Sequence, residues 1–267
     1  MEQIHRLIVE QLRDFAENAG FSDCVIGLSG GLDSSVVAAL CTETFGPAHV
    51  HGVLLPGPFS SDHSIEDALE LARNLGLETD IISITEPYEA FSNELEAYFD
   101  GGFTGVVSEN AQARIRMIML MAFSNAHNWM LVNTGNRSEA YMGYCTLYGD
   151  MAGAYAPIGG LYKTQVYDLA REINSIALDI GGLAPIPQRV LEKAPSAELA
   201  EDQTDEAGLG IGYAELDRIL AGHFDEGRAP SELASDTTPL AQVEELLARA
   251  KSFDYKRALL PPCAVIE

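Results

Sequence analysis

The chain has 267 residues, a length that favours one domain with appended segments. Hydrophobic residues make up 47% of the sequence, which excludes an intrinsically disordered or low-complexity chain. The 16 Lys and Arg against 40 Asp and Glu give a formal charge of -24, so the surface would repel a polyphosphate backbone and we expect no nucleic-acid partner.

The cysteines and the apolar segments indicate the compartment. Cysteine occurs without a C-x-x-C pair, and the N-terminal segment carries charges where a signal peptide needs an apolar run. The longest apolar stretch, Met117 to Phe123, is far shorter than the roughly 20 residues that span a bilayer. We therefore expect a cytoplasmic protein with no membrane partner.

Helical and strand-like patterns alternate through the first half of the chain. It opens with the apolar spacing of an amphipathic helix from Ile4 to Phe15. The elements expected next are a strand at 23–28, a helix at 33–44, a strand at 49–55, a helix at 62–75, a strand at 78–84, helices at 87–99 and 110–125, and a strand at 129–132. Strands that alternate with helices predict an α/β fold with a doubly wound parallel sheet and helices on both faces.

The second half is less regular. From 134 to 195 the composition turns to Gly, Tyr and Pro, and such loop-rich segments often carry function. Helical patterns recur only at 163–174, 213–220 and 240–250. The acidic stretch 198–206 is interpreted as a solvated loop and not as a binding site. We expect a single domain over residues 1–267, with a C-terminal part made of loops and short helices.

One segment, from Gly27 to Ser35, lies where the first expected strand meets the following helix. Glycines let the backbone approach an anion, serine hydroxyls donate hydrogen bonds to its oxygens, and a helix N-terminus adds about half a positive charge. The segment therefore predicts a phosphate-binding loop. Its members are Gly27, Leu28, Ser29, Gly30, Gly31, Leu32, Asp33, Ser34 and Ser35.

This loop has neither the lysine of a G-x-x-x-x-G-K-[ST] motif nor the spacing of G-x-G-x-x-G, so a Walker nucleotide hydrolase and a Rossmann dehydrogenase are not indicated. It resembles the pyrophosphate-binding loop of the ATP pyrophosphatase superfamily, Ser-Gly-Gly-x-Asp-Ser. The resemblance implies an adenine-nucleotide alpha-hydrolase-like fold and cleavage of ATP between its α- and β-phosphates. Asp33, an acid inside an anion site, requires a divalent cation between its carboxylate and the phosphates.

Several later segments resemble those of NAD synthetases and follow in the same order. Residues 110–116 resemble the Asn-x-x-x-Arg-x-Arg helix of these enzymes, and residues 134–139 resemble their second nucleotide loop. Further similar segments are 143–150, 157–163, 193–199, 204–206 and 255–257. The resemblance extends from about Leu7 to Pro262, so the chain resembles an NAD synthetase domain throughout.

The resemblance implies where ATP and its cation bind. ATP is expected on the loop from Gly27 to Ser35 and on Thr134, Lys163 and Ser196. Mg²⁺ is expected between the carboxylates of Asp33 and Glu139. The implied catalytic residues are Asp33, Glu139 and Lys163, which would position the phosphates and stabilise their charge without a side-chain nucleophile.

The same resemblance places deamido-NAD as the second substrate. Its implied contacts are Asn110, Arg114, Glu139, Tyr144, Cys145, Thr146, Leu147 and Lys256. Basic side chains would neutralise the pyrophosphate and carboxylate of the dinucleotide, and tyrosine offers a stacking surface. The implied reaction is amide formation, in which MgATP adenylates the nicotinate carboxylate, pyrophosphate leaves, and ammonia displaces AMP to give NAD.

The nitrogen donor is open between two sources. Residues 146–150, Ala154 and residues 255–256 resemble the synthetase domain of glutamine-dependent NAD synthetases, but we expect no room in this sequence for the amidase domain of those enzymes. No cysteine has a nearby histidine in a recognisable amidase pattern. We expect the chain to use free ammonia, with a separate glutaminase subunit as the alternative.

Other interpretations concern activity and assembly. A GMP synthetase of the same superfamily, or a nucleotide-binding subunit without activity of its own, would also contain the phosphate loop. The resemblance implies a homodimer with residues 110–125 at the subunit contact. Met117, Met119 and Met121 would give that helix an adaptable apolar face, although a position in the core explains them equally well.

Overall fold

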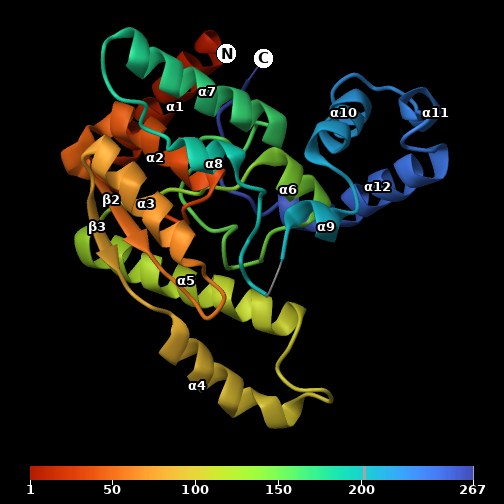
Figure 1. The fold of residues 1–267 in the computed structure, drawn as a ribbon, viewed down its shortest axis with the longest axis horizontal. Coiled ribbons are helices and arrows are strands. Elements are labelled where there is room, and N and C mark those ends of the chain that lie inside the picture. Colours follow the sequence, from red (N-terminus) through yellow and green to blue (C-terminus); the bar gives the residue numbers. More distant parts are fainter. Residues whose placement is uncertain (201–202, 267) are drawn as a thin grey trace.

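A computed structural model gives the structure of residues 1–200 and 203–266. At its centre lies a four-stranded parallel sheet in the order β3-β2-β1-β4 (Figure 1). The strands are β1 (Cys24–Gly27), β2 (Val50–Leu54), β3 (Glu78–Ile81) and β4 (Met130–Leu131). In the central pair, Val25 lies opposite His51 and Gly27 lies opposite Val53. The parallel sheet expected from the alternating pattern is confirmed.

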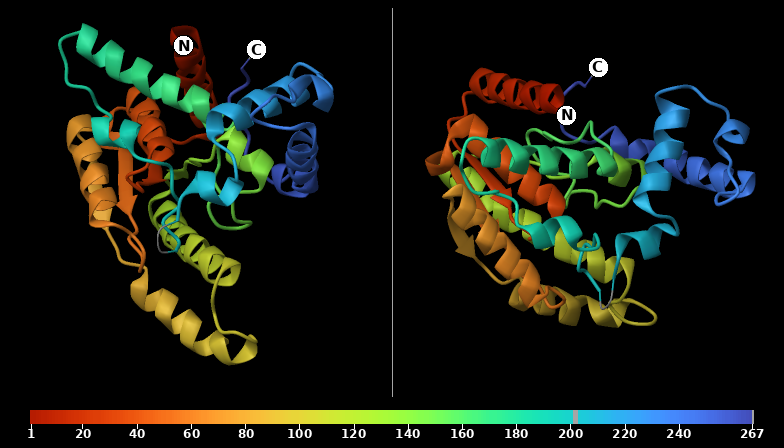
Figure 2. Two further views of the ribbon diagram at one scale, coloured as in Figure 1. Left: turned by 45° about the vertical axis from the view of Figure 1, so that its right-hand side comes forward. Right: turned by 45° about the horizontal axis from the view of Figure 1, so that its top comes forward.

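Helices cover both faces of this sheet (Figure 1 and Figure 2). On one face pack α1 (Glu2–Ala19), α2 (Leu32–Phe45), α3 (Asp62–Leu75) and α7 (Lys163–Asp179), and on the other packs α5 (Val106–His127). Successive residues of a strand point to opposite faces, so Ile26 joins the core under α1 and α2 while Val25 contacts the core under α5. The doubly wound α/β class is confirmed.

Local capping explains why α3 begins and ends at the expected residues, 62 and 75. Ser61 precedes the helix, and its hydroxyl accepts a hydrogen bond from the backbone N–H of Ser64 at 3.2 Å. Gly76 follows it in the left-handed conformation, with a φ of 72°. The helix ends therefore follow from residues that the sequence places at its boundaries.

The remaining helices are α4 (Thr85–Leu95), α6 (Arg137–Met142), α8 (Gln188–Glu192), α9 (Asp205–Leu209), α10 (Tyr213–Phe224), α11 (Pro230–Leu233), α12 (Leu240–Ser252) and α13 (Asp254–Arg257), and single 3-10 turns lie at Pro47–His49 and Glu96–Tyr98. The sequence pattern did not predict α6 or α9, because their 6 and 5 residues are too few to show a helical period. The third strand ends at Ile81, three residues earlier than expected, although the Ile82 N–H still donates to the Leu54 carbonyl at 2.9 Å.

Helices α6, α10, α11 and α12 share a second apolar core beside the sheet, and Figure 1 shows the green α6 next to the blue helices α10 to α12. Met142, Leu216, Leu220, Leu233 and Val243 form the centre of this cluster. The C-terminal part is thus helical as expected, but it packs largely on itself. The expectation of a single domain stays a prediction.

The methionines of α5 do not form the expected apolar stripe. Met117 is buried in the core and Met119 packs partly buried against it, whereas Met121 is 37% exposed. The exposed apolar neighbour of Met121 is Ile118. Neither α5 nor any other helix within residues 1–200 and 203–266 is long and apolar enough to cross a membrane.

The C-terminal segment returns to the sheet. Ala156 and Cys263 form an isolated parallel bridge. Gln11 of α1 holds the same segment, since its Nε2 donates to the Val265 carbonyl at 3.0 Å and its Oε1 accepts from the Val265 N–H at 2.9 Å. The N-terminal helix and the C-terminal segment therefore lie side by side (Figure 1).

Candidate active site

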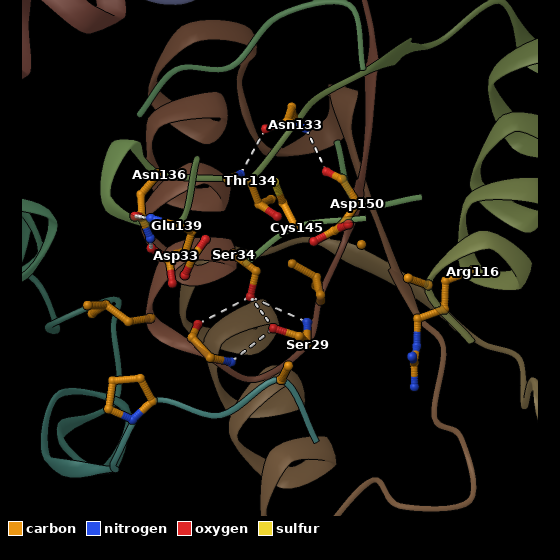
Figure 3. A pocket seen from close by; sticks show the side chains of 18 of the residues that line it. Ser29, Asp33, Ser34, Arg116, Asn133, Thr134, Asn136, Glu139, Cys145 and Asp150 are labelled. Atoms are coloured by element: carbon orange, nitrogen blue, oxygen red, sulfur yellow. Dashed lines mark hydrogen bonds between the residues drawn. The ribbon is translucent and has the colours of Figure 1, made fainter. Parts of the chain in front are cut away.

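The loop between β1 and α2 is held by hydrogen bonds among its own residues. The hydroxyls of Ser29 and Ser34 lie 3.0 Å apart, and the Gly31 N–H donates to Ser29 Oγ at 3.2 Å (Figure 3). The hydroxyls of Ser34 and Ser35 donate to the Gly31 carbonyl at 3.2 and 2.7 Å. Because these bonds join residues at most five positions apart, the loop conformation follows from local sequence.

Gly30 brings this loop into contact with the next helix. Its φ of 75° lies in the left-handed region that favours glycine. A Cβ at this position would lie 2.0 Å from the carbonyl oxygen of Ser64, so no side chain fits. The starts of α2 and α3 therefore meet at the carboxyl ends of β1 and β2, where open parallel sheets bind ligands.

Three charged side chains from different elements meet beside the loop. Lys163 Nζ, at the start of α7, pairs with Asp33 of α2 and lies 3.3 Å from Glu139 Oε1 of α6. Asn136 links the two acids, because its Nδ2 donates to Asp33 Oδ1 at 2.9 Å and its Oδ1 accepts from the Glu139 N–H at 3.0 Å (Figure 3). The Lys163 side chain is only 3% exposed. Three residues predicted to be catalytic are thus brought together.

Burial and neighbouring charges set the protonation of this cluster. Burial raises the pKa of Glu139 above its usual value; Lys163 opposes this shift and Asp33 adds to it. Burial alone would lower the pKa of Lys163, but the carboxylates of Asp33 and Glu139 outweigh it and raise that pKa. The lysine therefore remains charged, whereas the raised pKa of Glu139, about 8, favours its protonated form at neutral pH. A further cation beside Glu139 would favour its ionised form.

These groups open onto a cavity of about 360 Å³. The predicted site residues that line it are Gly27, Leu28, Ser29, Gly31, Leu32, Asp33, Ser34, Thr134, Glu139, Tyr144, Cys145, Lys163 and Ser196. The predicted residues outside its lining are Gly30, Ser35, Asn110, Arg114, Thr146, Leu147 and Lys256. Most of the predicted ATP residues thus face one cavity, whereas most of the predicted deamido-NAD residues do not.

The predicted deamido-NAD residues of α5 hold a loop at the cavity edge. Thr146 Oγ1 donates to Asn110 Oδ1 at 2.8 Å, and Arg114 Nε donates to the Leu147 carbonyl at 3.1 Å. Asn110 and Arg114 lie four residues apart and therefore on one side of the helix. The structure brings these four residues together, and their contact with a dinucleotide stays a prediction.

Lys256 holds the same loop from the opposite side. Its Nζ donates to the carbonyls of Gly143 and Cys145 at 2.9 and 2.6 Å. Its ammonium also lies 5.1 Å from the centre of the Phe253 ring. Lys256 therefore positions the backbone next to Cys145, a residue that lines the cavity.

The segment 193–199 closes another side of the cavity. Lys193 Nζ pairs with Glu198 Oε1 at 2.9 Å. Glu198 also accepts hydrogen bonds from the Ser61 N–H and the Ser64 hydroxyl, at 3.1 and 2.7 Å, and so joins the segment to the start of α3. Both Lys193 and Glu198 line the cavity. The interpretation of the acidic stretch as a solvated loop is wrong for Glu198, which is held by fixed hydrogen bonds.

Asp205, in the same acidic stretch, is also part of the site. It is 4% exposed, its Oδ2 accepts from Tyr213 Oη at 3.1 Å, and its Oδ1 has no hydrogen-bond partner among residues 1–200 and 203–266. It lines the cavity together with Lys163. The solvated-loop interpretation is therefore wrong here too, while Glu201 and Asp202 lie outside the described residues.

Three further cavity residues were missed by the sequence reasoning. Arg116 donates from Nε to the Leu55 carbonyl at 2.9 Å, and burial lowers its pKa to about 10. Asn133 Nδ2 donates to the backbone carbonyl of Asp150 at 2.7 Å (Figure 3). Arg116 is the last position of the Asn-x-x-x-Arg-x-Arg pattern, and Asp150 ends the segment 143–150. Both segments had been compared with NAD synthetases, so the signal was present but unused.

The acidic groups of the cavity suit a metal ion that arrives with a ligand. Within the described parts of the chain, no group of three or more His, Cys, Asp or Glu side chains is arranged to hold a metal by itself. Mg²⁺ typically takes one or two protein carboxylates and obtains its other ligands from phosphates and water. Asp33 and Glu139 match that donor set.

Comparison with known proteins gives a consistent set of relatives. Residues 4–260 match the family model described as NAD synthase. The chain is 44% identical to the glutamine-dependent NAD(+) synthetase of Thermotoga maritima over 96% of its own length, but it spans only 44% of that protein. It is 39% identical to the NH(3)-dependent NAD(+) synthetase of Wolinella succinogenes, over 97% of this chain and 94% of the relative. The solved structure of NMN synthetase from Francisella tularensis is similar with a TM-score of 0.77 and 33% identity, over 94% of each chain.

Proposed function

Because the chain belongs to the NAD synthase family, we propose that it converts deamido-NAD to NAD with ATP and ammonia. The nicotinate carboxylate attacks the α-phosphate of ATP, and pyrophosphate leaves. Ammonia then attacks the acyl adenylate, a proton is lost, and AMP leaves as the carboxamide forms. The observation that carries the proposal is one cavity in which the phosphate loop, with its Asp33, faces Lys163 and Glu139.

The chain's own groups would act on ATP by position and charge. The hydroxyls of Ser29 and Ser34 and the N-terminus of α2 offer hydrogen-bond donors to phosphate oxygens. Lys163 would balance the charge that develops on the departing pyrophosphate. Its burial makes that interaction stronger than it would be in water. No side-chain nucleophile is needed for either step.

We propose Mg²⁺ as the ion that accompanies ATP, held by Asp33 and Glu139. The support is that both carboxyl groups line the cavity and lie beside one ammonium. When bound, the ion would shield phosphate charge and make the α-phosphate more electrophilic. Replacing Mg²⁺ by excess chelator should stop AMP formation, and AMP formation that continued in chelator would contradict the assignment.

We infer that free ammonia is the nitrogen donor for this chain. Hydrolysis of glutamine needs a cysteine thiolate. Burial raises the pKa of Cys145 to about 12, so the thiol nearest the expected substrate loop is protonated at neutral pH. The 94% coverage of the ammonia-dependent relative supports the same donor. A separate glutaminase subunit that supplies ammonia is the alternative.

The thiols also bear on the compartment, and we infer a cytoplasmic location. Cys24 and Cys41 are buried, Cys145 and Cys263 are partly buried, and all are free. Disulfides form in oxidising compartments and are rare in the reducing cytoplasm. The free thiols support the cytoplasm as the site of action.

We propose a homodimer that forms through α5 and the neighbouring α4. Exposed apolar side chains on these elements and on the 3-10 turn after α4 are Phe91, Tyr98, Val106, Ile118 and Met121. An apolar surface of this kind often marks a protein contact. Sedimentation equilibrium should show a dimer at micromolar concentration. A monomer with full activity would contradict the proposal.

The activity test supplies both nitrogen donors separately. The purified chain is incubated with ATP, Mg²⁺ and deamido-NAD, with either ¹⁵N-ammonium or amide-¹⁵N-glutamine. We expect labelled NAD, AMP and pyrophosphate in equal amounts from ammonium and no labelled NAD from glutamine. The matched control is Lys163→Met, which should remove the activity. Turnover of ATP without any NAD would overturn the proposed function.

A second candidate product is NMN, and two observations favour it. The likeness to an NMN synthetase structure is strong, with a TM-score of 0.77. Asn110, Arg114 and Lys256, which the family resemblance assigns to the dinucleotide, lie outside the cavity lining. Nicotinate mononucleotide should therefore be tested beside deamido-NAD. The ratio of the two kcat/KM values decides between the candidates, and the family assignment sets the GMP synthetase interpretation aside.

A further inference from the structure

The first turn of α7 presents an electrostatic problem that its own sequence does not solve. Lys163 is the first residue of the helix, and the first turn contains no acid. A helix N-terminus carries partial positive charge, so a cation there is unfavourable. The N–H groups of the first turn also need acceptors. Gln165 of the same helix accepts from the Tyr162 N–H at 2.9 Å. The missing acid and the acceptors for the N–H groups of Lys163 and Thr164 must come from another part of the chain.

Asp217 of α10 meets both needs. Its Oδ2 accepts from the Thr164 N–H at 2.8 Å, and its Oδ1 accepts from the Ser138 hydroxyl at 2.5 Å. Ser138 Oγ in turn accepts from the Lys163 N–H at 2.9 Å. Asp217 is 4% exposed, Ser138 is fully buried, and Lys163 is 2% exposed. One buried carboxylate thus caps α7 directly and through a serine.

The same bonds fix two groups of the candidate active site. Ser138 directly precedes Glu139, and Thr164 directly follows Lys163. A shift of α6 or α7 would therefore change the separation of the Glu139 carboxylate and the Lys163 ammonium, which is 3.3 Å. The carboxylate of Asp217 joins the two helices, because it accepts hydrogen bonds from both Ser138 of α6 and Thr164 of α7.

We infer that Asp217 is a positioning residue, which sets Lys163 and Glu139 at their working separation from the helical cluster formed by α6, α10, α11 and α12. Its importance for turnover rests on the proposed function, whereas its effect on the position of Lys163 does not. The helical cluster thereby contributes to the geometry of the site, although Asp217 itself does not line the cavity.

The main test compares Asp217→Asn with Glu215→Gln. An asparagine keeps the shape, but its amide nitrogen cannot accept from Thr164 or Ser138, so one of the two bonds is lost. Glu215 is a matched control because it lies on the same helix and its carboxylate bonds Arg218 and Thr238 instead. We expect kcat to fall on the order of 10- to 100-fold in Asp217→Asn, as is typical of a displaced catalytic group. In Glu215→Gln we expect kcat to be unchanged.

A second readout does not depend on turnover. Lys163 is one of only four lysines, so mass spectrometry can follow its acetylation by acetic anhydride residue by residue. We expect Lys163 to react severalfold faster in Asp217→Asn than in the wild type, with Lys251 unchanged as the internal reference. If the wild type makes no NAD from any substrate but Lys163 is still labelled faster in Asp217→Asn, the proposed function is refuted and the positioning role stays intact.

Ser138→Ala completes a double-mutant cycle with Asp217→Asn. If the two residues act on Lys163 through one chain of bonds, their effects on log kcat are strongly non-additive. The inference would be overturned if Asp217→Asn and Glu215→Gln had equal melting temperatures and equal kcat, and if the labelling of Lys163 were unchanged. Should Asp217→Asn not fold, Ser138→Ala alone must show the kcat loss and the faster labelling, and normal values for both would also overturn it.

Discussion

The two sides of the cavity are built in different ways. The phosphate loop from Gly27 to Ser35 forms through bonds between near neighbours, such as the 3.0 Å contact of Ser29 with Ser34. Lys163 and Glu139 on the facing side are placed by residues far away in the chain. The bond from Ser138 to Asp217, for example, spans 79 positions.

This difference indicates how each side responds to change. A locally built loop keeps its shape when distant parts are altered, but it tolerates no change in its own backbone. A side assembled from several helices tolerates many single changes, but it depends on contacts that no local segment contains. Variants can test the two sides of the cavity separately. The expected changes in the free energy of unfolding, or in the free energy equivalent to a change in kcat or KM, run from about 4 to about 1 kcal/mol.

The largest effect is expected from Gly30→Ala. Its Cβ would lie 2.0 Å from the Ser64 carbonyl oxygen, so either the loop or α3 must move. We expect a loss of about 4 kcal/mol or more in the free energy of unfolding, measured in urea. Gly20→Ala is the matched control, because Gly20 has a similar φ of 78° and nothing within 4 Å of the added Cβ. It should cost only about 1 kcal/mol. Equal losses in both variants would mean that the close approach to α3 is unimportant.

Asp33→Asn should affect activity and leave the fold intact. The variant keeps an acceptor for Asn136 but removes charge that faces Lys163. We expect kcat to fall by a factor on the order of 10² to 10³, the usual effect of removing one charge-stabilising group. Asp62→Asn removes the equivalent first-turn acid of α3, which is exposed, and should leave kcat unchanged. Near-normal turnover of Asp33→Asn at limiting Mg²⁺ would refute the metal assignment.

Lys256→Met tests the side assembled from distant helices. Loss of the bonds to the carbonyls of Gly143 and Cys145 should loosen the loop at the cavity edge. We expect KM for the nicotinate substrate to rise about tenfold, equivalent to about 1.4 kcal/mol, while KM for ATP stays constant. Lys251→Met, at an exposed position of α12, serves as the control. A parallel rise in both KM values would instead indicate a general loss of structure.

The smallest effect concerns the helical cluster at a distance from the cavity. The hydrogen bond from Arg218 is the main cause that lowers the pKa of Glu215 to about 2, against an ordinary value of 4.5. Its carboxylate therefore stabilises the folded state fully above pH 4.5, and this contribution is lost as the pH falls toward 2. Because the side chain is partly exposed, we expect about 1 kcal/mol between wild type and Glu215→Gln at pH 7. Urea unfolding at several pH values should show this difference shrinking below pH 4.5, and a constant difference would exclude the carboxylate as its source.

The locally determined parts were the ones that the sequence could predict. The bounds of α3 agree because Ser61 and Gly76 mark its ends. The phosphate loop was identified with its glycines and serines in place, since strand, turn and helix follow one another without interruption. In these segments, the residues that determine the local conformation lie within the segment itself.

The long-range parts could be predicted only where a family resemblance supplied them. Lys163 and Glu139 were placed in the site by such a resemblance, and the structure brings them together. Asp205 lies in the segment 204–206 that resembles NAD synthetases but was given no role. Asp217 was not placed, because it forms no local pattern and reaches the site from the C-terminal half through a fold that must form first. The solvated appearance of the acidic stretch was misleading for the same reason, since burial of Asp205 depends on Tyr213 and other tertiary contacts.

The return of the C-terminal segment to the sheet affects how the protein is made on the ribosome. Leu260, Pro261 and Cys263 line the cavity, and the Ala156 N–H donates to the Pro262 carbonyl at 2.9 Å. Synthesis proceeds from the N-terminus, so the phosphate loop and Lys163 emerge long before this wall exists. A nascent chain can therefore fold its sheet early, but its cavity stays open on one side until residues 260–263 have been translated.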